Sequence, residues 1–254
     1  MNPPATGNDN KQEEYTVKII IGTEQEIAQK AAQRYVELLA KKPAAVLGYA
    51  TGSTPLGLYA ELVRLNQAGA IDYKDVTTFN LDEYAGLDGT HDQSYRYFMD
   101  KNLFEQINID RAHTHVPSGL DIAAAADYDR QIEAAGGIDL QLLGIGNNGH
   151  IGFNEPFTPF GSRTHLVELT ESTREANKRF FASIDDVPTH AVTMGVRTVM
   201  NARAIILMAI GEGKAEIIQK TVNGPVTEEV PASVLQLHPD CEIYLDYGAA
   251  SLLK

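Results

Sequence analysis

Cysteine and basic residues are scarce in this chain of 254 residues. Its one cysteine, Cys241, excludes an intramolecular disulfide and a zinc site built from cysteines, and we expect a cytoplasmic protein. Lysine and arginine number 21 against 34 acidic residues, a net charge of −13. That balance argues against a nucleic-acid or anionic-membrane binder, but it leaves room for a local basic pocket that holds one phosphate. No apolar run approaches the length of a membrane span, and the N-terminus lacks the apolar region of a signal peptide.

The hydrophobic content of 43% is enough for a substantial core. Residues 1–14 are polar, and we predict that they are disordered. From residue 15 to 254, strand-like and helix-like segments alternate without a repeat or a linker. This alternation predicts a single three-layer α/β/α domain whose sheet is mainly parallel and Rossmann-like, with about seven strands.

Local patterns of apolar residues and helix-capping residues predict where the strands and helices lie. Short β-branched or wholly apolar runs predict strands at 15–22, 44–50, 76–81, 138–146, 189–194, 203–210 and 242–246. A loop with a further short strand is expected at 110–117. Helices are expected at 24–42, 55–68, 94–107, 122–135, 171–183, 196–201, 214–222, 231–238 and 247–253, and the segment 157–170 is expected to be irregular. Thr23 and Glu26 predict a capping box, and Thr54 before Pro55 predicts another helix N-cap.

The run from Gly144 to Pro156 (GIGNNGHIGFNEP) carries the most chemistry in the chain. Its glycines let the backbone turn sharply and approach a ligand, and it follows a predicted strand. His150 and Glu155 form a plausible proton-handling pair, because imidazole titrates near neutral pH. The alternative is a turn-rich strand exit with a surface histidine.

Other strand ends carry weaker signals. The turn Gly52-Ser53-Thr54 between a buried strand and a helix suits a phosphate, although an ordinary connection has the same composition. It is neither a Walker loop nor GxGxxG, so a nucleotide is not indicated. Asp82 and Glu83 follow the strand 76–81, where they could be helix caps, surface groups or a general base.

Basic residues stand out in so acidic a chain. Arg174, Lys178 and Arg179 fall within six residues of the predicted helix 171–183, either as a solvated face or with one arginine toward an anion. Lys214 lies in the first turn of a predicted helix, where a cation opposes the helix dipole, and an anionic ligand would explain it. His113 and His115 have no third metal ligand nearby, so we interpret them as surface or core histidines.

Four stretches, in order, resemble one family. They are LGYATGSTPLGLY (47–59), FNLDEYAGL (79–87), LLGIGNNGHIGFNEP (142–156) and LQLHP (235–239). Together they are similar to the glucosamine-6-phosphate deaminases, and the likeness extends over roughly residues 15 to 250. The same family includes galactosamine-6-phosphate isomerases and 6-phosphogluconolactonases, which are the alternatives within it.

The resemblance implies isomerisation and hydrolytic deamination of glucosamine 6-phosphate to fructose 6-phosphate and ammonia, without a metal or an organic cofactor. It assigns ring opening to His150, oriented by Glu155, and removal of the C2 proton to Asp82. It also implies that the substrate phosphate is bound by Gly52, Ser53, Thr54, Arg179 and Lys214. A non-catalytic sugar-phosphate sensor is the alternative of another class, but sensors tend to lose the acid and the histidine that this chain keeps.

Two positions depart from some relatives. Asn148 stands where some members have aspartate, so we expect it to hydrogen-bond the imidazole without adding charge, and the pH dependence to differ. His165 and Val167 follow Ser162-Arg163-Thr164 where allosterically activated members have basic residues. Activation by an N-acetylated sugar phosphate is therefore not expected, and the sequence leaves open whether the chain is a monomer or a homo-oligomer.

Overall fold

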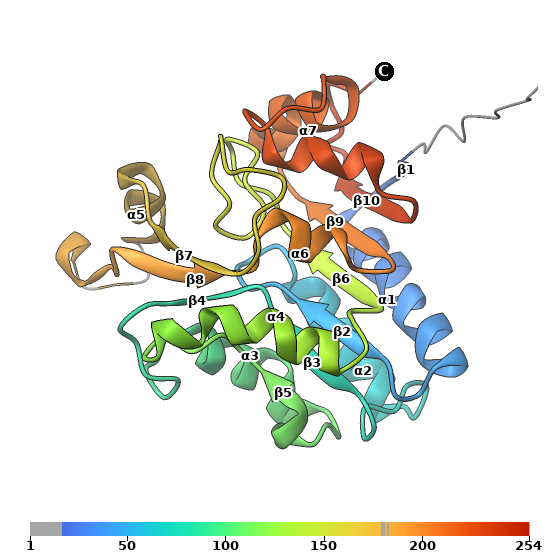
Figure 1. Ribbon diagram of the computed structural model, residues 1–254. Coiled ribbons are helices and arrows are strands. Elements are labelled where there is room, and N and C mark those ends of the chain that lie inside the picture. The colour runs from blue at the N-terminus through green and yellow to red at the C-terminus, as the bar shows by residue number, and fades with distance from the viewer. Residues whose placement is uncertain (1–16, 179–180, 182, 254) are drawn as a thin grey trace, which may run out of the picture.

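A seven-stranded parallel sheet runs through the middle of the computed structural model, which describes residues 17–178, 181 and 183–253 (Figure 1). Every neighbouring pair of strands in it is parallel. From one edge to the other the strands are β1 (Lys18–Gly22), β10 (Cys241–Asp246), β9 (Ile205–Ala209), β6 (Leu140–Leu143), β2 (Val46–Tyr49), β3 (Thr77–Asn80) and β5 (Thr114–His115). The predicted parallel sheet of about seven strands is confirmed.

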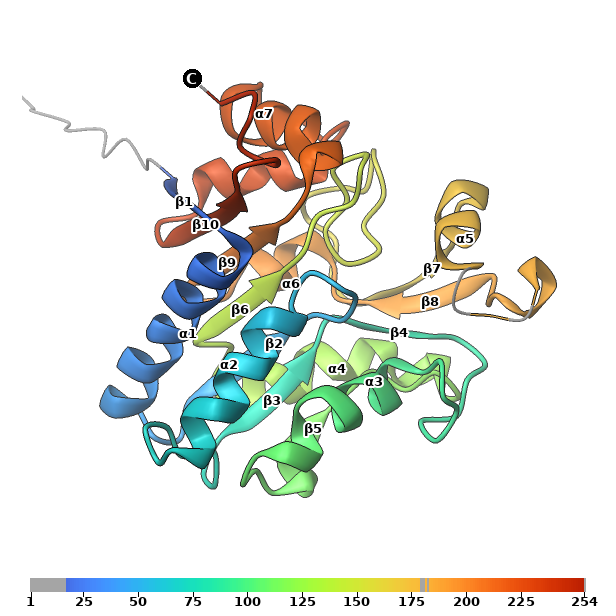
Figure 2. The ribbon, with the colours of Figure 1, turned by 180° about the vertical axis from the view of Figure 1, so that it is seen from behind.

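Helices cover both faces of this sheet, which gives the three layers. Figures 1 and 2 show α1 (Glu24–Lys41) and α2 (Leu56–Gln67) on one face and α4 (Ala125–Ala134) and α6 (Val196–Met200) on the other. The remaining α-helices are α3 (Tyr95–Asn102), α5 (Glu171–Asn177) and α7 (Ala215–Asn223). Short 3₁₀ turns lie at Phe104–Gln106, Arg111–His113, Ile122–Ala124, Ile184–Asp186, Glu212–Lys214 and Pro231–Leu237.

The first helix begins as its sequence predicts. The hydroxyl of Thr23 accepts a hydrogen bond from the backbone N–H of Glu26 at 3.2 Å, and the Glu26 carboxylate accepts one from the Thr23 N–H at 2.8 Å. This capping box satisfies two amide groups that have no partner within the helix. The apolar face that follows is buried in the main core, through Ile27, Ala31, Ala32, Tyr35 and Leu39.

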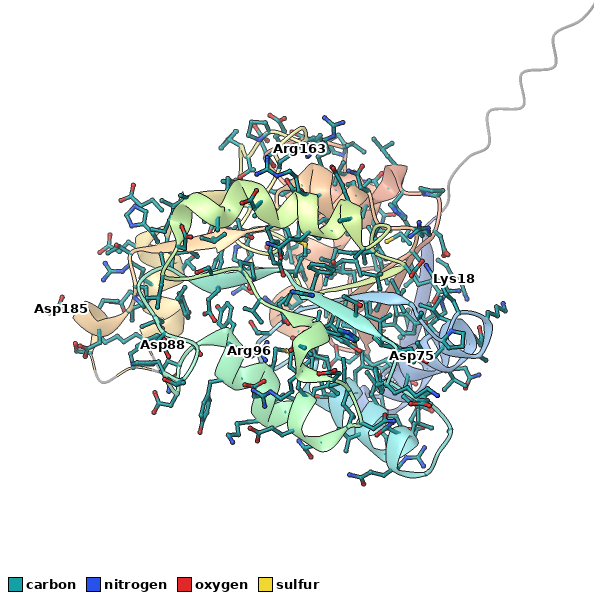
Figure 3. The ribbon with its side chains drawn as sticks, turned by 60° about the horizontal axis from the view of Figure 1, so that its bottom comes forward. Lys18, Asp75, Asp88, Arg96, Arg163 and Asp185 are labelled. Carbon is teal, nitrogen blue, oxygen red and sulfur yellow. The ribbon has the colours of Figure 1, made fainter. Side chains whose placement is uncertain are left out.

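A second, smaller sheet was not predicted. It is antiparallel, in the order β4 (Asp82–Tyr84), β8 (His190–Thr193) and β7 (His165–Glu168). The expectation of an irregular 157–170 segment is wrong at β7, a strand of four residues (HLVE) with no buried position, which is too short to give a clear signal in the sequence. We call β7, α5 and β8 the arm, because Figure 1 shows them projecting from the main sheet, and Figure 3 labels Asp185 at its outer end.

Two local expectations are also wrong. Thr54 does not cap α2: Pro55 occupies the cap position, and no side chain accepts a hydrogen bond there. The N–H of Leu56 bonds instead to the Ser53 carbonyl, so a backbone turn precedes the helix. Residues 247–253 form turns rather than a helix, because the Asp246 carboxylate binds the N–H groups of Ala249 and Gly211 and holds this segment against the turn after β9.

Candidate active site

The carboxyl ends of four neighbouring strands carry the candidate residues that the structure describes. Since the strands are parallel, these ends share one edge of the sheet. The chain winds outward in opposite directions from β2 and β6, and ligands of open α/β sheets bind at such a reversal. In sheet order, β9 is followed by Lys214, β6 by Asn148, His150 and Glu155, β2 by Gly52, Ser53 and Thr54, and β3 by Asp82.

Asp82 is a buried carboxylate at the start of β4. Its side chain lies against the loop after β6: a Cβ placed on Gly152 would be 3.5 Å from Asp82 Oδ2. Burial, together with the nearby charge of Glu83, raises the pKa of Asp82 to about 8. The structure therefore places a carboxyl group with increased basicity beside the histidine loop, as a general base requires.

Glu83 has a different task from its neighbour. Its carboxylate accepts hydrogen bonds from the backbone N–H groups of Tyr84 and Tyr95 at 2.9 Å and of Arg96 at 3.0 Å. The last two N–H groups begin α3, so Glu83 caps this helix. Burial raises the pKa of Glu83, although the three hydrogen bonds act to lower it. Of the roles that the sequence left open for the two acids, capping belongs to Glu83.

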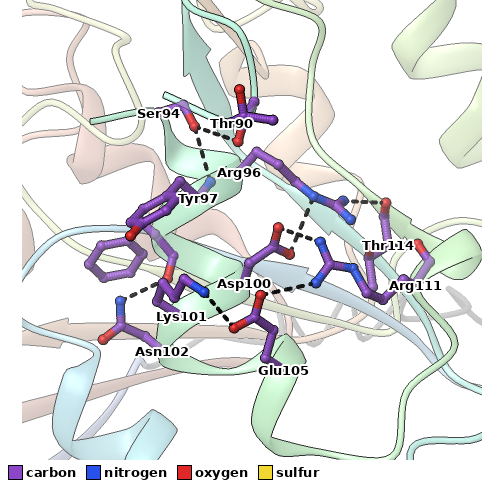
Figure 4. Close-up of polar contacts among 12 residues, drawn as sticks. Thr90, Ser94, Arg96, Tyr97, Asp100, Lys101, Asn102, Glu105, Arg111 and Thr114 are labelled. Carbon is purple, nitrogen blue, oxygen red and sulfur yellow. Dashed lines mark hydrogen bonds and ion pairs between the residues drawn. The ribbon is translucent and has the colours of Figure 1, made fainter. Parts of the chain in front are cut away.

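Ion pairs fix α3 where it meets Glu83. Figure 4 shows Arg96 and Arg111 both contacting Asp100, at 3.3 Å and 2.5 Å. Arg96 also donates to the Thr114 carbonyl of β5 at 2.9 Å. Helix α3 is thereby tied to the edge of the main sheet, and the amide groups that bind Glu83 are held in place beside Asp82.

His150, Asn148 and Glu155 meet in the loop after β6. Nδ1 of His150 lies 3.4 Å from Oε1 of Glu155, and Nδ2 of Asn148 donates to Oε2 of Glu155 at 2.5 Å. The side-chain Oδ1 of Asn148 accepts a hydrogen bond from the backbone N–H of His150 at 3.2 Å. Asn148 thus contacts the carboxylate and the backbone, and the hydrogen bond to the imidazole that the sequence suggested is not the one formed.

The charge of Glu155 is strongly stabilised. Burial alone would raise its pKa, but the nearby imidazole of His150 and the hydrogen bonds from Thr173 and Asn148 lower the pKa to about 2. Glu155 is consequently a permanent anion at neutral pH. It can orient the imidazole and stabilise its protonated form.

The imidazole of His150 lies directly over Gly146. A Cβ placed on this glycine would be 2.3 Å from Cε1, 2.4 Å from Nε2 and 2.5 Å from Nδ1 of the ring. The loop is closed beneath the ring by a hydrogen bond from the Gly146 N–H to the His150 carbonyl at 2.9 Å. Only a glycine leaves room for this ring position.

Lys214 reaches the same loop from the end of β9. Its ammonium group donates to the Ile145 carbonyl at 2.7 Å and to Asn147 Oδ1 at 2.6 Å, and burial lowers its pKa. These contacts account for a cation immediately before α7. They also place a positive charge at the shared edge of the sheet.

The turn after β2 is open. Gly52 has a φ of +98°, a conformation that favours glycine, and no described atom lies within 4 Å of a Cβ placed on it. Ser53 is exposed and Thr54 is half-buried, so both residues are accessible to a ligand. Arg179, the other candidate for the phosphate, lies outside the described residues.

Sequence reasoning missed two residues of this site. Thr173 of α5 donates a hydrogen bond from Oγ1 to Glu155 Oε1 at 2.6 Å, although it lies 18 positions away in a polar helix with no local signal. The glycines of the loop were noted for flexibility, but nothing in the sequence shows that Gly146 makes room for the ring.

No metal centre and no membrane-spanning helix are found within 17–178, 181 and 183–253. No three His, Cys, Asp or Glu side chains gather there in a way that could hold a metal ion. None of the helices is both long and apolar enough to cross a bilayer. His115 stacks on Phe79 with ring centroids 4.7 Å apart, in keeping with its interpretation as a core histidine.

Comparisons with known proteins point to one family. The family model for glucosamine-6-phosphate isomerases/6-phosphogluconolactonase matches residues 22–243. The glucosamine-6-phosphate deaminase of Clostridium perfringens (strain 13 / Type A) is 51% identical over 93% of this chain and 99% of its own. That of Shewanella loihica is 51% identical over 92% of this chain and 89% of its own.

Solved structures show the same fold. A monomeric glucosamine-6-phosphate deaminase aligns with a TM-score of 0.90 and 44% identity, over 93% of this chain and 100% of that one. The 6-phosphogluconolactonase of Thermotoga maritima aligns with a TM-score of 0.72 over 91% of this chain and 100% of that one. At 17% identity, this second likeness concerns the fold alone.

Proposed function

Because the chain belongs to the family of glucosamine-6-phosphate isomerases and 6-phosphogluconolactonases, we propose that it is a glucosamine-6-phosphate deaminase. It converts glucosamine 6-phosphate and water to fructose 6-phosphate and ammonia. The observation that carries this proposal is the meeting of Asp82 with the His150–Glu155 loop at the point where the sheet reverses. The deaminases that are 51% identical to the chain support it.

In this proposal His150 opens the sugar ring. Ring opening moves a proton from the anomeric hydroxyl to the ring oxygen, and an imidazole can accept and return that proton near neutral pH. Glu155 lies 3.4 Å from Nδ1 and keeps its charge, so it stabilises the imidazolium form during the transfer. Asn148 holds the other carboxylate oxygen without adding a second negative charge.

Asp82 then acts on the open chain. Its carboxylate removes the proton from C2 to give an enolamine and returns it at C1, which produces the ketose skeleton with an imine at C2. Water adds to this imine, and ammonia leaves. A pKa raised to about 8 makes Asp82 a stronger base than an ordinary carboxylate, although less of it is ionised at neutral pH.

The phosphate group is bound on the neighbouring strand ends. Gly52, Ser53 and Thr54 offer N–H and hydroxyl groups before α2, and Lys214 adds a cation from the turn after β9. Arg179 remains our candidate for a second cation. Each step is a proton transfer or a hydrolysis, so we propose that the enzyme uses no cofactor, and that it acts on the sugar phosphates of the cytoplasm.

The proposal is tested by incubating pure protein with glucosamine 6-phosphate and measuring ammonia and fructose 6-phosphate. We expect equal amounts of the two products, and no release would refute the proposal. Parallel assays with galactosamine 6-phosphate and 6-phosphogluconolactone separate the other activities of the family. Faster turnover of either of these would reassign the chain within it.

The role of Asp82 is tested with Asp82→Asn. We expect this variant to lose C2 proton exchange by about 10²–10⁴-fold, the usual contribution of a general base, and to bind a phosphorylated sugar as before. The measurement is incorporation of solvent deuterium at C1 of the product. Asp75→Asn removes an exposed carboxylate and serves as the matched control. Exchange that persists in Asp82→Asn contradicts the assignment.

A further inference from the structure

One hydrogen bond joins the arm to the residues that we propose for ring opening. Thr173 is a buried residue of α5, and its hydroxyl donates to Oε1 of Glu155 at 2.6 Å. Figure 1 shows α5 on the arm, apart from the loop after β6 that carries Glu155. The contact therefore joins two parts of the molecule that approach the site from different sides.

The same carboxylate oxygen faces His150. Nδ1 of the imidazole lies 3.4 Å from Glu155 Oε1, which is long for a hydrogen bond, whereas 2.6 Å is a typical length for a hydroxyl bound to a carboxylate. The carboxylate cannot turn to offer its other oxygen, because Asn148 donates to Oε2 at 2.5 Å. Thr173 and His150 thus share one oxygen, and Thr173 holds it more tightly.

The hydroxyl proton of Thr173 has a defined direction. Oγ1 of Thr170, at the N-cap of α5, donates to Oγ1 of Thr173 at 3.0 Å, so the Thr173 proton is left for Glu155. The turn at the start of α5 consequently sets where this proton points. A shift of α5 would change the bond to Glu155 directly.

We propose that Thr173 is a positioning residue, whose hydroxyl fixes Glu155 and limits how strongly Glu155 pairs with His150. The position of α5 thereby regulates the strength of the His150–Glu155 pair. This inference rests on the proposed function of that pair. Thr173 contacts the carboxylate rather than the substrate, so it acts through Glu155.

Other charged groups lie near the pair or next to Thr173, and each has partners other than the Thr173 hydroxyl. Lys214 donates to Ile145 and Asn147 in the same loop. Asp82 lies against Gly152, further along the loop. Arg174, next to Thr173 in α5, donates to the carbonyls of Ile184 and Val187.

The test replaces Thr173 by valine, which keeps the shape and removes the hydroxyl. We expect Glu155 to pair more strongly with His150, so the imidazole ¹⁵N resonances of His150, assigned with His150→Gln, change in the full-length protein without substrate. We also expect the acid limb of the kcat/KM profile to move to higher pH, because a Glu155 carboxylate that no longer accepts the Thr173 hydroxyl attracts the protonated imidazole more strongly. KM should stay within about twofold, since no substrate contact is lost.

Two variants serve as controls. Thr173→Ser restores the hydroxyl and should restore the wild-type resonances and profile. Thr158→Val removes a hydroxyl that donates to the backbone carbonyl of Glu155 at 2.7 Å, so it should leave both readouts unchanged. If Thr173→Val does not fold, as judged by thermal unfolding, Thr173→Ala is measured with the same expectation.

The inference is overturned if the His150 resonances stay unchanged without the hydroxyl, if Thr158→Val changes them equally, or if Thr173→Ser does not restore them. A variant that is only less stable, with unchanged resonances and profile, shows a merely structural role. The resonances need no turnover. They decide the inference even if the wild-type protein releases no ammonia, an outcome that refutes the proposed function instead.

Discussion

Replacing Gly146 by alanine is expected to displace the imidazole of His150 without unfolding the protein. The added Cβ would lie 2.3–2.5 Å from three atoms of the ring, closer than non-bonded atoms approach. Gly146 does not have a positive φ, so alanine can adopt its backbone conformation. The His150 side chain is 24% exposed, which gives the ring a route toward solvent.

The loss of stability in Gly146→Ala depends on whether the His150 ring can move toward solvent. A core that cannot relax loses about 1–3 kcal/mol when an extra methyl group is forced in, but a ring that moves outward loses only its contact with Glu155. We therefore expect the free energy of unfolding to fall by about 1 kcal/mol. Activity should fall far more, by about 100-fold in kcat/KM, the lower range for loss of a positioned general acid–base group.

The assay is ammonia release from glucosamine 6-phosphate, with thermal unfolding measured on the same preparations. Gly144→Ala is the matched control, because no described atom lies within 4 Å of a Cβ placed on Gly144. In Gly146→Ala combined with His150→Gln, the second change should cost no further activity, since both remove the same group. A rate for Gly146→Ala within twofold of wild type would refute the role of this ring position.

Three further predictions concern pH and the arm. The pKa of Asp82 is raised from 3.8 to about 8, so the folded state holds the Asp82 proton and loses stability as pH rises between these values. Asp82→Asn should therefore unfold at a higher temperature than wild type at pH 8–9. Equal pH dependence of the unfolding temperature in the two proteins contradicts this. The pKa of Glu155 is lowered from 4.5 to about 2, so its contribution to folding stability is present above pH 4.5 and is lost as the pH falls to 2. The unfolding temperature of Glu155→Gln should therefore fall less steeply over that range than that of wild type. An unchanged slope contradicts the contribution of Glu155 to stability. The segment 157–188 is our candidate for a lid over the site, so its amide hydrogen exchange should slow when substrate binds, and exchange that does not change excludes a lid.

Sequence alone determined the elements and the class of chemistry. Apolar runs bounded by glycine and proline marked six of the seven strands of the main sheet, because a strand buried on both faces has to be apolar along its length. The seventh strand, β5, consists of two polar residues, and the strand expected at 189–194 lies in the small sheet as β8. The capping box of Thr23 and Glu26 was readable because its partners lie three residues apart. The candidate residues were found at strand ends for the same reason: motif, strand and turn are neighbours in the chain.

Tertiary structure decided which strand ends come together in space. The order of the strands places the loops after β9, β6, β2 and β3 side by side, and no local pattern specifies that order. It also distinguished Asp82, which faces Gly152, from Glu83, which caps α3. The small sheet escaped prediction because its strands are short and pair with segments far away in the chain.

The contacts of Glu155 show most clearly which features the sequence determines and which depend on the tertiary structure. The sequence placed His150 and Glu155 in one loop, since five residues separate them. Only the folded chain brings Thr173 of the arm to the same carboxylate and turns Asn148 toward it instead of toward the ring. Such choices depend on distances between segments that are remote in sequence. They are set by packing in three dimensions, after each segment has already taken the local structure that its own residues favour.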